Sequence, residues 1–500
     1  MAGGAGGIVA RSGIRRGGRG RYSVGDSTGG GGASLSSRIA SHRVEGAVAS
    51  GPSWWHWGEG PACEDGDVTD ATGPIREAEG LIRFIDASPS PYHASSEAAG
   101  LLQAAGFGPL DPTDHWPAGG RHYLIHGGTL VAWAVGAGTK PSSGMRLVGA
   151  HTDSPNLRIR PQPDATKLGF RQLGVDVYGG VLLNSWLDRD LGLSGRVVVR
   201  SGSEREVRLF RLDLPLLRIP QLAPHLDREV RERGVLLNAQ TQLVPIWGLD
   251  GPEESTLVDL LGAELKVAPD QILGWDLMTH DLTPGRISGR SGEFVSVARL
   301  DNLGCTYTAT RALVEHVTAG GDREPGVAAI CLFDHEEVGS VSSSGAAGAI
   351  LPSVLERVGL AMGGSREDLL RSLAGSACVS ADMSHALNPN YGERYEPGHA
   401  LQLNQGPAIK YNASQRYATD AVGAATFAAA CEKAGVPFQR YVNRGDLPCG
   451  STIGPITAAR LGVDTVDVGM SQLAMHSARE LGGSADPSYM VRALTAFLGS

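Results

Sequence analysis

Cysteine is scarce in this sequence. Among 500 residues only six are cysteine, and they lie at Cys63, Cys305, Cys331, Cys378, Cys431 and Cys449. No two of them form a CxxC pair, so the sequence argues against a small disulfide scaffold and against a zinc ribbon. Several lie inside apolar segments, and we therefore expect free, buried thiols in the reducing cytoplasm.

Long apolar runs and an excess of positive charge are also missing. The longest apolar stretches fall well short of the ~20 residues that a membrane-spanning helix needs. The formal net charge is -9, which argues against a body that binds nucleic acid. Hydrophobic residues make up 41% of the chain. That proportion is enough for a large core and predicts two or three domains.

Acidic residues are nearly absent from the N-terminal segment. Within residues 1–38 the only one is Asp26, whereas glycine, arginine and serine are abundant. Such a segment cannot bury enough apolar surface to fold, so residues 1–73 are predicted to be a disordered Gly/Arg-rich extension. An organelle transit peptide has a similar composition. We favour the plain extension, because so much glycine weakens the amphipathic helix that a transit peptide needs.

Along the rest of the chain the pattern of predicted secondary structure changes twice. Residues 74–162 and 299–500 alternate strand and helix patterns, which predicts an α/β domain with a largely parallel sheet covered on both faces. Residues 163–298 are dominated by strand and hairpin patterns, which predicts an inserted β-rich domain. Helical signals within it are confined to residues 221–234 and 255–265.

Polar residues follow the predicted strands at five points. They are His151 and Asp153 in GAHTDSP, Asp301 in RLDNLG, Glu336 and Glu337 in DHEEVGS, Asp382 in SADMSHA, and His476 in QLAMHSARE. Sites in parallel sheets gather at the carboxyl ends of the strands. We therefore expect these side chains to lie together.

Two histidines with several carboxylates suit a pair of divalent metal ions. This ligand chemistry favours zinc, with manganese or cobalt as alternatives. Two ions ~3.5–4 Å apart can polarise a carbonyl and generate a nucleophile at neutral pH. A carboxylate that is not a ligand must then accept the proton. Adjacent glutamates on an extended chain point in different directions, so one of Glu336 and Glu337 can bind metal while the other remains free.

Longer motifs around these residues resemble the aspartyl aminopeptidase family of co-catalytic zinc metallopeptidases. They are GAHTDSPNLRIRP, YGGVLLNSWLDRDLGLSGR, RLDNLG, DHEEVGS, SADMSHALNPNY, GPAIKYNASQRYATD, LPCGSTIGPI and QLAMHSARE, and they extend from about Pro74 to the C-terminus. The resemblance implies that His151 and Asp382 hold one zinc ion. Glu337 and His476 would hold the other, with Asp301 bridging the two.

The resemblance also implies roles for two further carboxylates. Glu336 would be the general base, and Asp153 would orient His151 as the acceptor of its far N–H. The family fold is an α/β peptidase domain with an inserted β-rich dimerisation domain. Its members form tetrahedral dodecamers built from dimers, with active sites that face an interior chamber.

Substrate contacts are implied as well. Lys410 in GPAIKYN would pair with an acidic substrate side chain, and Arg416 and Arg444 are alternative cations nearby. His385 and Tyr417 match other substrate contacts of the family.

One further contact concerns the inserted segment. His225 matches a family histidine that reaches into the partner subunit's active site. The alternative is a polar residue that caps a local helix. The neighbouring apolar residues exceed what a small β domain needs for its core and predict an interface. They are Leu216, Leu217, Ile219, Leu222 and Leu226.

The leading hypothesis is a zinc aminopeptidase that removes N-terminal Asp or Glu from peptides in the cytoplasm. One alternative keeps the metal site but has a broader specificity, or acts as a dipeptidase or deacylase. A dipeptidase needs a cation for the substrate α-carboxylate, whereas an aminopeptidase needs an acceptor for the free α-amine. Another alternative is an inactive self-assembling scaffold. The intact ligand set and Glu336 argue against it.

Overall fold

The computed structural model describes residues 72–251 and 255–500. All of them belong to one compact unit, Asp67–Ser500. Nearly all of the predicted N-terminal extension, together with Cys63, therefore lies outside the described residues. The other five cysteines are free, and four of them are buried.

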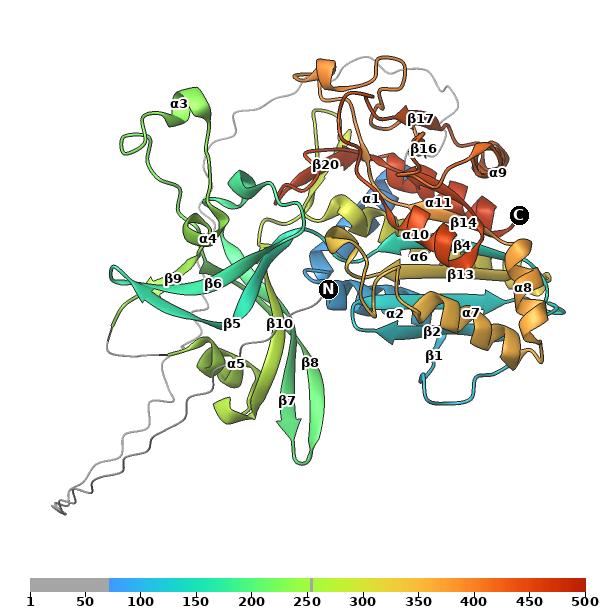
Figure 1. Ribbon diagram of the computed structural model, residues 1–500, viewed down its shortest axis with the longest axis horizontal. Helices are drawn as coiled ribbons and strands as arrows, with labels where there is room; N and C mark the ends of the chain where they lie inside the picture. The colour runs from blue at the N-terminus through green and yellow to red at the C-terminus, as the bar shows by residue number, and fades with distance from the viewer. Residues whose placement is uncertain (1–71, 252–254) are drawn as a thin grey trace, which may run out of the picture. The chain divides into compact units, whose positions relative to one another are not determined.

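A nine-stranded sheet forms the centre of the α/β part (Figure 1). In sheet order its strands are β1 (Gly108–Pro109), β2 (Gly120–His126), β3 (Thr129–Val135), β13 (Val327–Phe333), β4 (Met145–His151), β14 (Ala377–Ala381), β18 (Asp464–Gly469), β16 (Ala408–Tyr411) and β17 (Gln439–Val442). Strands β13, β4, β14 and β18 run parallel to one another. The predicted largely parallel sheet is thus confirmed at its centre, while β2–β3, β3–β13 and β16–β18 pair antiparallel.

Helices cover both faces of this sheet. One face carries α1 (Thr72–Ala87), α2 (Pro91–Ala104), α6 (Leu300–Thr318), α9 (Ala421–Ala434) and α11 (Asp486–Leu498). The other face carries α7 (Ile350–Ala361), α8 (Arg366–Ala374) and α10 (Ile453–Leu461). Alternate residues of β13 enter the two cores: Ile330 packs on the first face and Cys331 on the second. A strand buried on both sides must be apolar throughout, which explains the run VAAICLF.

A six-stranded antiparallel sheet forms the β-rich part. In sheet order its strands are β8 (Glu204–Leu217), β7 (Leu191–Ser201), β10 (Ile272–Asp281), β5 (Asn156–Lys167), β6 (Phe170–Tyr178) and β9 (Ile246–Leu249). With α5 (Leu257–Leu265) it encloses a core of its own. Its strands span residues 156–281, whereas the sequence suggested a β-rich segment of 163–298.

The difference at the later boundary comes from a third sheet. It consists of β11 (Arg286–Ser288), β12 (Phe294–Val297), β20 (Glu480–Gly483), β19 (Ser471–Leu473) and β15 (Ser384–His385). Because β12 pairs with β20, the predicted hairpin ISGRSGEFVSVARL joins the C-terminal part of the chain.

The 3-10 helices among the described residues are η1 (Leu183–Trp186), η2 (Pro269–Gln271), η3 (Gly321–Arg323), η4 (Glu336–Val338) and η5 (Gly392–Arg394).

Residues 218–245, here called the arm, connect β8 to β9 (Figure 1). The helical signal over 221–234 was wrong for most of its length: only α3 (Val230–Arg233) and α4 (Ala239–Gln242) are helical in the arm. A short helix needs packing against other residues, and Leu222 and Leu226 are 58% and 76% exposed.

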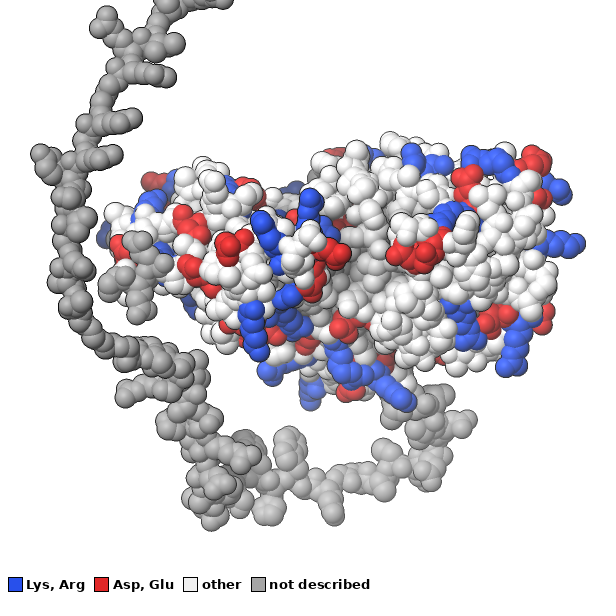
Figure 2. All heavy atoms as spheres, turned by 90° about the horizontal axis from the view of Figure 1, so that it is seen from below, with Lys and Arg blue, Asp and Glu red and all other residues white. Residues whose placement is uncertain are grey.

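The surface carries both signs of charge. On the face drawn in Figure 2, basic and acidic side chains are interspersed, so this face offers no extended basic surface to a nucleic-acid backbone. Among residues 72–251 and 255–500, no helix combines the length and the hydropathy of a membrane span.

Candidate metal centre

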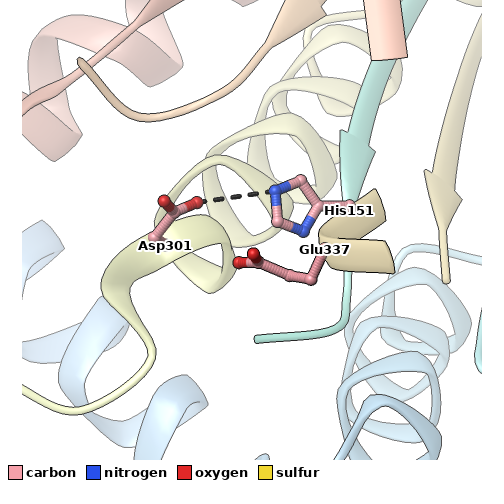
Figure 3. Close-up of side chains that lie close together, drawn as sticks. All are labelled: His151, Asp301 and Glu337. Atoms are coloured by element: carbon pink, nitrogen blue, oxygen red, sulfur yellow. Dashed lines mark ion pairs between the residues drawn. The ribbon is translucent and has the colours of Figure 1, made fainter. Parts of the chain in front are cut away.

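The predicted site residues meet at one edge of the nine-stranded sheet. His151 is the last residue of β4, and Asp382 directly follows β14. Glu337 lies in η4 just beyond β13, and Asp301 lies in the first turn of α6 with non-helical backbone angles. His476 follows β19. Figure 3 shows the side chains of His151, Asp301 and Glu337 converging from three separate elements.

Four short separations join the two histidines to three carboxylates. His151 Nε2 lies 3.4 Å from Asp301 Oδ1 and 3.5 Å from Asp382 Oδ1. His476 Nε2 lies 3.6 Å from Asp301 Oδ2 and 3.5 Å from Glu337 Oε2. The two carboxylate oxygens of Asp301 therefore face different histidines. His151, Asp301 and Glu337 also bring one potential ligand atom each within 4.8 Å of one another.

The far nitrogens of both imidazoles have protein acceptors. His151 Nδ1 lies 3.0 Å from the backbone oxygen of Asp153 and 3.4 Å from its Oδ1. His476 Nδ1 lies 2.9 Å from the backbone oxygen of Gly180. If each Nδ1 carries the proton and donates it there, each Nε2 presents a lone pair to the carboxylates. This is the tautomer that a metal-binding histidine adopts.

The Asp153 carboxylate mainly holds the turn that carries the two glutamates. Oδ1 accepts the backbone N–H of Glu336 and Oδ2 that of Glu337, both at 3.1 Å. Tyr178 donates its hydroxyl to Oδ2 at 2.7 Å. Burial opposes ionisation of Asp153, but the hydrogen bond and charge of His151 outweigh it and lower the pKa of Asp153. Asp153 therefore stays an acceptor and fixes η4.

The two glutamates diverge because of a turn. The sequence suggested an extended chain here, whereas Glu336 and Glu337 lie in the 3-10 helix η4, flanked by left-handed residues His335 and Gly339. Successive residues of a 3-10 helix are ~120° apart around its axis. Glu336 Oε2 accordingly lies 3.9 Å from the Nε2 of His151, and Glu337 faces His476 instead.

Negative charge is in excess in this cluster. Burial raises the pKa of Glu336 to about 8, and burial with the charge of Asp301 raises the pKa of Glu337. Burial works against the charged form of His476, but the hydrogen bond of Asp301 and the charge of Glu337 raise its pKa to about 10. Each carboxylate thus gains from an added positive charge nearby.

Two buried carboxylate oxygens indicate whether a metal ion fits this site. Asp301 Oδ1 and Glu337 Oε1 are buried, and neither has a hydrogen-bond partner among the described residues. A buried acceptor without a partner is costly unless an ion or water satisfies it. Imidazole nitrogens and carboxylate oxygens are the donors that zinc takes in catalytic sites. The residues therefore fit zinc.

Glu480 in β20 is a supporting residue that the sequence reasoning missed. It accepts the backbone N–H of Asp301 at 3.0 Å and that of His476 at 2.7 Å. One buried carboxylate thus fixes the main chain of two predicted ligands, and burial raises its pKa to about 8. The available signal was its position in QLAMHSARE, four residues after His476.

Lys410 in β16 lies beside the cluster and is not a surface residue. It is 2% exposed, and its Nζ donates to the backbone oxygen of Met383 at 2.9 Å. The same nitrogen lies 3.9 Å from Asp382 Oδ2 and 5.3 Å from the centre of the Tyr417 ring. Tyr417 and His385 both lie near Tyr441, with ring centroids 6.4 Å apart in each pair.

The other predicted contacts make no hydrogen bond or ion pair with the cluster in the part of the chain that the structure describes. Arg444 pairs with Asp446 at 2.6 Å, and the exposed Arg416 donates to the backbone oxygen of Cys449. His225 is exposed on the arm, and within the described ranges it has no hydrogen bond or ion pair with the metal centre. Leu217 and Ile219 are buried in the core of the six-stranded sheet, so their predicted role in an interface was wrong. Leu222 and Leu226 are exposed.

Comparison with protein families gives a match over most of the chain. The family described as aminopeptidase I zinc metalloprotease (M18) matches residues 84–498. A probable M18 family aminopeptidase 2 of Streptomyces coelicolor is 50% identical over 420 residues, which cover 84% of this chain and 96% of the relative. A protein of the same name from Mycobacterium leprae is 48% identical over 427 residues, which cover 85% and 98%.

Solved structures give the same result. A chain of the Ape4 and Nbr1 complex superposes with a TM-score of 0.83 at 37% identity, covering 86% of this chain and 87% of that chain. The crystal structure of prApe1 has a TM-score of 0.81 at 30% identity, with 85% and 94% covered. The mApe1 dodecamer of yeast has a TM-score of 0.74 at 29% identity, with 85% and 96% covered.

Proposed function

This chain belongs to the aminopeptidase I (M18) family of zinc metalloproteases, and from that premise we propose that it removes N-terminal aspartate or glutamate from peptides with the help of two zinc ions. Membership makes it a zinc aminopeptidase, a metallo-exopeptidase. The number of ions, the roles of the residues, the acidic preference and the assembly are our proposal.

The observation that carries the two-ion site is the position of Asp301. Its two oxygens lie 3.4 Å and 3.6 Å from the Nε2 atoms of different histidines. Two ligands of a tetrahedral zinc ion, each at ~2.1 Å, are about 3.4 Å apart. These distances support one ion between His151, Asp382 and Asp301, and a second between His476, Glu337 and Asp301.

The chain's own residues would then act around the substrate. Zinc supplies Lewis acidity to the scissile carbonyl and to the attacking water. Glu336, half-buried and outside the proposed ligand set, takes the proton of that water at its carboxylate and passes it to the leaving amine. The Asp153 carboxylate keeps Glu336 in place because it accepts the backbone N–H of Glu336.

Lys410 is our candidate for the acidic preference. A buried ammonium that meets a substrate carboxylate favours it, whereas a neutral side chain leaves the ammonium without that partner. Arg444 is already paired with Asp446, and Arg416 is exposed, so both are weaker candidates. His385 and Tyr417 complete the proposed substrate contacts.

We extend the proposal to assembly and location. The β-rich segment, predicted from the sequence as residues 163–298, would be a dimerisation domain, and dimers would build a dodecamer, the assembly named for the yeast relative. His225 on the exposed arm would reach the partner subunit's active site. His225→Ala should then lose turnover with zinc uptake intact, and mixing it with His476→Ala under subunit exchange should restore some activity. The free thiols fit a reducing compartment such as the cytoplasm.

A substrate screen tests the function. The purified chain would be assayed on p-nitroanilides of Asp, Glu, Ala and Leu, after chelation and after zinc restoration, with direct measurement of bound zinc. We expect zinc-dependent turnover that is fastest on Asp or Glu, and none on the same substrates with an acetylated amine. Equal rates on all four would overturn the acidic preference. Cleavage of N-blocked substrates would favour a dipeptidase or deacylase.

A further inference from the structure

The residues Tyr178, Gly179 and Gly180, here called the YGG segment, leave the end of β6 and run along the metal centre. Strand β6 belongs to the six-stranded sheet, and every proposed metal ligand comes from elsewhere in the chain. The YGG segment nevertheless contacts Asp153, which lies against His151, and it contacts His476 directly. Of its glycines, only the Gly180 carbonyl has a role so far, as the acceptor of His476 Nδ1.

The first contact is made by the Tyr178 hydroxyl. It donates to Asp153 Oδ2 at 2.7 Å. The Asp153 carboxylate accepts the backbone N–H groups of Glu336 and Glu337 and lies 3.4 Å from His151 Nδ1, which also faces the Asp153 backbone oxygen at 3.0 Å. The ring is held in turn by Arg158, whose guanidinium carbon lies 4.1 Å from the ring centroid. A stacked cation of this kind fixes the ring. The hydroxyl is therefore aimed at Asp153 by packing on its other side.

The second contact is made by the main chain. The Gly180 carbonyl accepts His476 Nδ1 at 2.9 Å, and two residues later the N–H of Leu182 donates to the His476 carbonyl at 3.1 Å. His476 is thus held at its ring and at its backbone by the same short stretch. The Gly180 bond also selects the tautomer that leaves Nε2 free to face Asp301 and Glu337.

The close approach of the YGG segment to the metal centre explains why two of its residues are glycine. A Cβ on Gly179 would lie 3.1 Å from Glu337 Cβ, and a Cβ on Gly180 would lie 3.0 Å from His476 Nδ1. Gly179 also has a φ of +74°, which favours glycine. The chain therefore approaches both groups more closely than a side-chain-bearing residue allows without displacement of its neighbours.

We propose that the YGG segment is a positioning device that holds both histidines from outside the metal centre, so that the six-stranded sheet helps to set zinc affinity. This inference rests on the proposed two-ion site. Tyr178 acts on His151 through Asp153, and Gly180 acts on His476 directly. Gly180 therefore serves the ion at His476, whereas Tyr178 serves both ions, because Asp153 Oδ2 also accepts the backbone N–H of Glu337.

Zinc titration of the metal-free full-length protein against a chromophoric chelator tests the idea. The two binding steps are first assigned with His151→Ala and His476→Ala, each of which should lose its own step. Tyr178→Phe removes one hydroxyl and should weaken the His151 step and, through the Asp153 bond to Glu337, also the His476 step. Gly180→Ala should weaken the His476 step. Loss of an outer hydrogen-bond partner typically costs roughly 10–100-fold in metal affinity.

Two substitutions serve as matched controls. Tyr123→Phe removes the hydroxyl of a tyrosine in β2, away from the metal centre. That hydroxyl accepts a hydrogen bond from Gln103 Nε2. Gly174→Ala adds a methyl group in the same strand β6, where the nearest heavy atom lies 3.4 Å away. Both should bind zinc like the parent chain. Thermal unfolding in excess zinc checks that every variant is folded. If Gly180→Ala does not fold, the test rests on Tyr178→Phe.

The possible results separate the inference from the function on which it rests. A parent chain that binds two ions, with Tyr178→Phe and Gly180→Ala unchanged in both steps, would overturn the positioning role and leave the two-ion site standing. Equal weakening of both steps by both variants would also overturn it, because that points to general loosening. A parent chain that binds one ion would overturn the two-ion site and this inference together.

Discussion

In the metal centre charged groups are buried against one another, whereas on the arm leucines lie in solvent. Asp301 is 4% exposed and has a buried oxygen without a hydrogen-bond partner in the described chain. Leu226 on the arm is 76% exposed. Buried carboxylates are costly without a cation, and exposed apolar groups are costly without a covering surface.

Each of the two regions therefore lacks something that the single chain does not supply. The metal centre needs positive charge, which zinc would provide. The arm needs apolar surface, which a second copy of the chain would provide. Substitutions in the two regions should accordingly fail in different ways: the first by loss of metal and chemistry, the second by loss of assembly.

The largest effect is expected at Asp301. Asp301→Ala removes the oxygens that face both histidines, so it should lose both zinc ions and nearly all turnover. Elemental analysis after gel filtration would measure zinc per chain, and a chromogenic acidic substrate would measure activity. Asp114→Ala, at an exposed aspartate far along the chain, is the control and should keep both ions. Retention of one ion by Asp301→Ala would mean that Asp301 does not bridge.

Glu336 should separate chemistry from metal binding. Glu336→Gln keeps the shape of the side chain but removes the base, so we expect normal zinc content and a ~10²–10⁴-fold lower kcat. The adjacent Glu337→Gln is the matched comparison and should lose the ion at His476. If Glu336→Gln lost zinc and Glu337→Gln kept it, the two assignments would have to be exchanged.

A smaller and selective effect is expected at Lys410. Lys410→Met keeps the length of the side chain and removes its charge. Loss of one member of a buried charge pair costs roughly 2–5 kcal/mol, so kcat/KM should fall strongly on Asp-p-nitroanilide and little on the Leu compound. Arg416→Met should change neither. An equal fall on both substrates would show that Lys410 supports the fold around Asp382 and does not select the substrate.

The smallest effect on chain stability is expected on the arm. Leu217, in the core of the six-stranded sheet, is 1% exposed, so Leu217→Ala should lower the free energy of unfolding by about 2–5 kcal/mol. Leu226→Ala should change it by less than about 0.5 kcal/mol but should weaken assembly. Denaturant titration and light scattering would measure the two quantities. A stable, fully assembled Leu226→Ala protein would remove Leu226 from the interface.

Sequence patterns predicted the α/β part well. Continuous apolar runs such as residues 327–333 mark strands buried on both faces, and polar residues at their ends mark the edge where sites gather. The same reasoning predicted that His151, Asp153, Asp301, Glu336, Glu337, Asp382 and His476 lie together, whereas the choice of Glu337 as the metal ligand was implied only by the family resemblance. It worked because each residue lies at, or a few residues beyond, the end of a local element.

The arm was predicted poorly, for a related reason. Residues 221–234 have helical spacing, but in the structure their leucines Leu222 and Leu226 have little to pack against. Leu217 and Ile219 looked like part of an interface because sequence distance does not show which apolar residues the six-stranded sheet covers. Burial is a property of the assembled core, and the local pattern could not report it.

The sequence by itself determined the types of residue at the site and the order of the elements that carry them. Ligand chemistry and strand patterns are local properties, so they can be read along the chain. Only the tertiary structure decided at what distances Asp301 faces the two histidines, that Lys410 is buried beside Asp382, and that Glu480 supports two ligands at once. It also decided that Gly180 lies against His476, 296 residues apart in the chain, because such contacts arise only when distant segments pack.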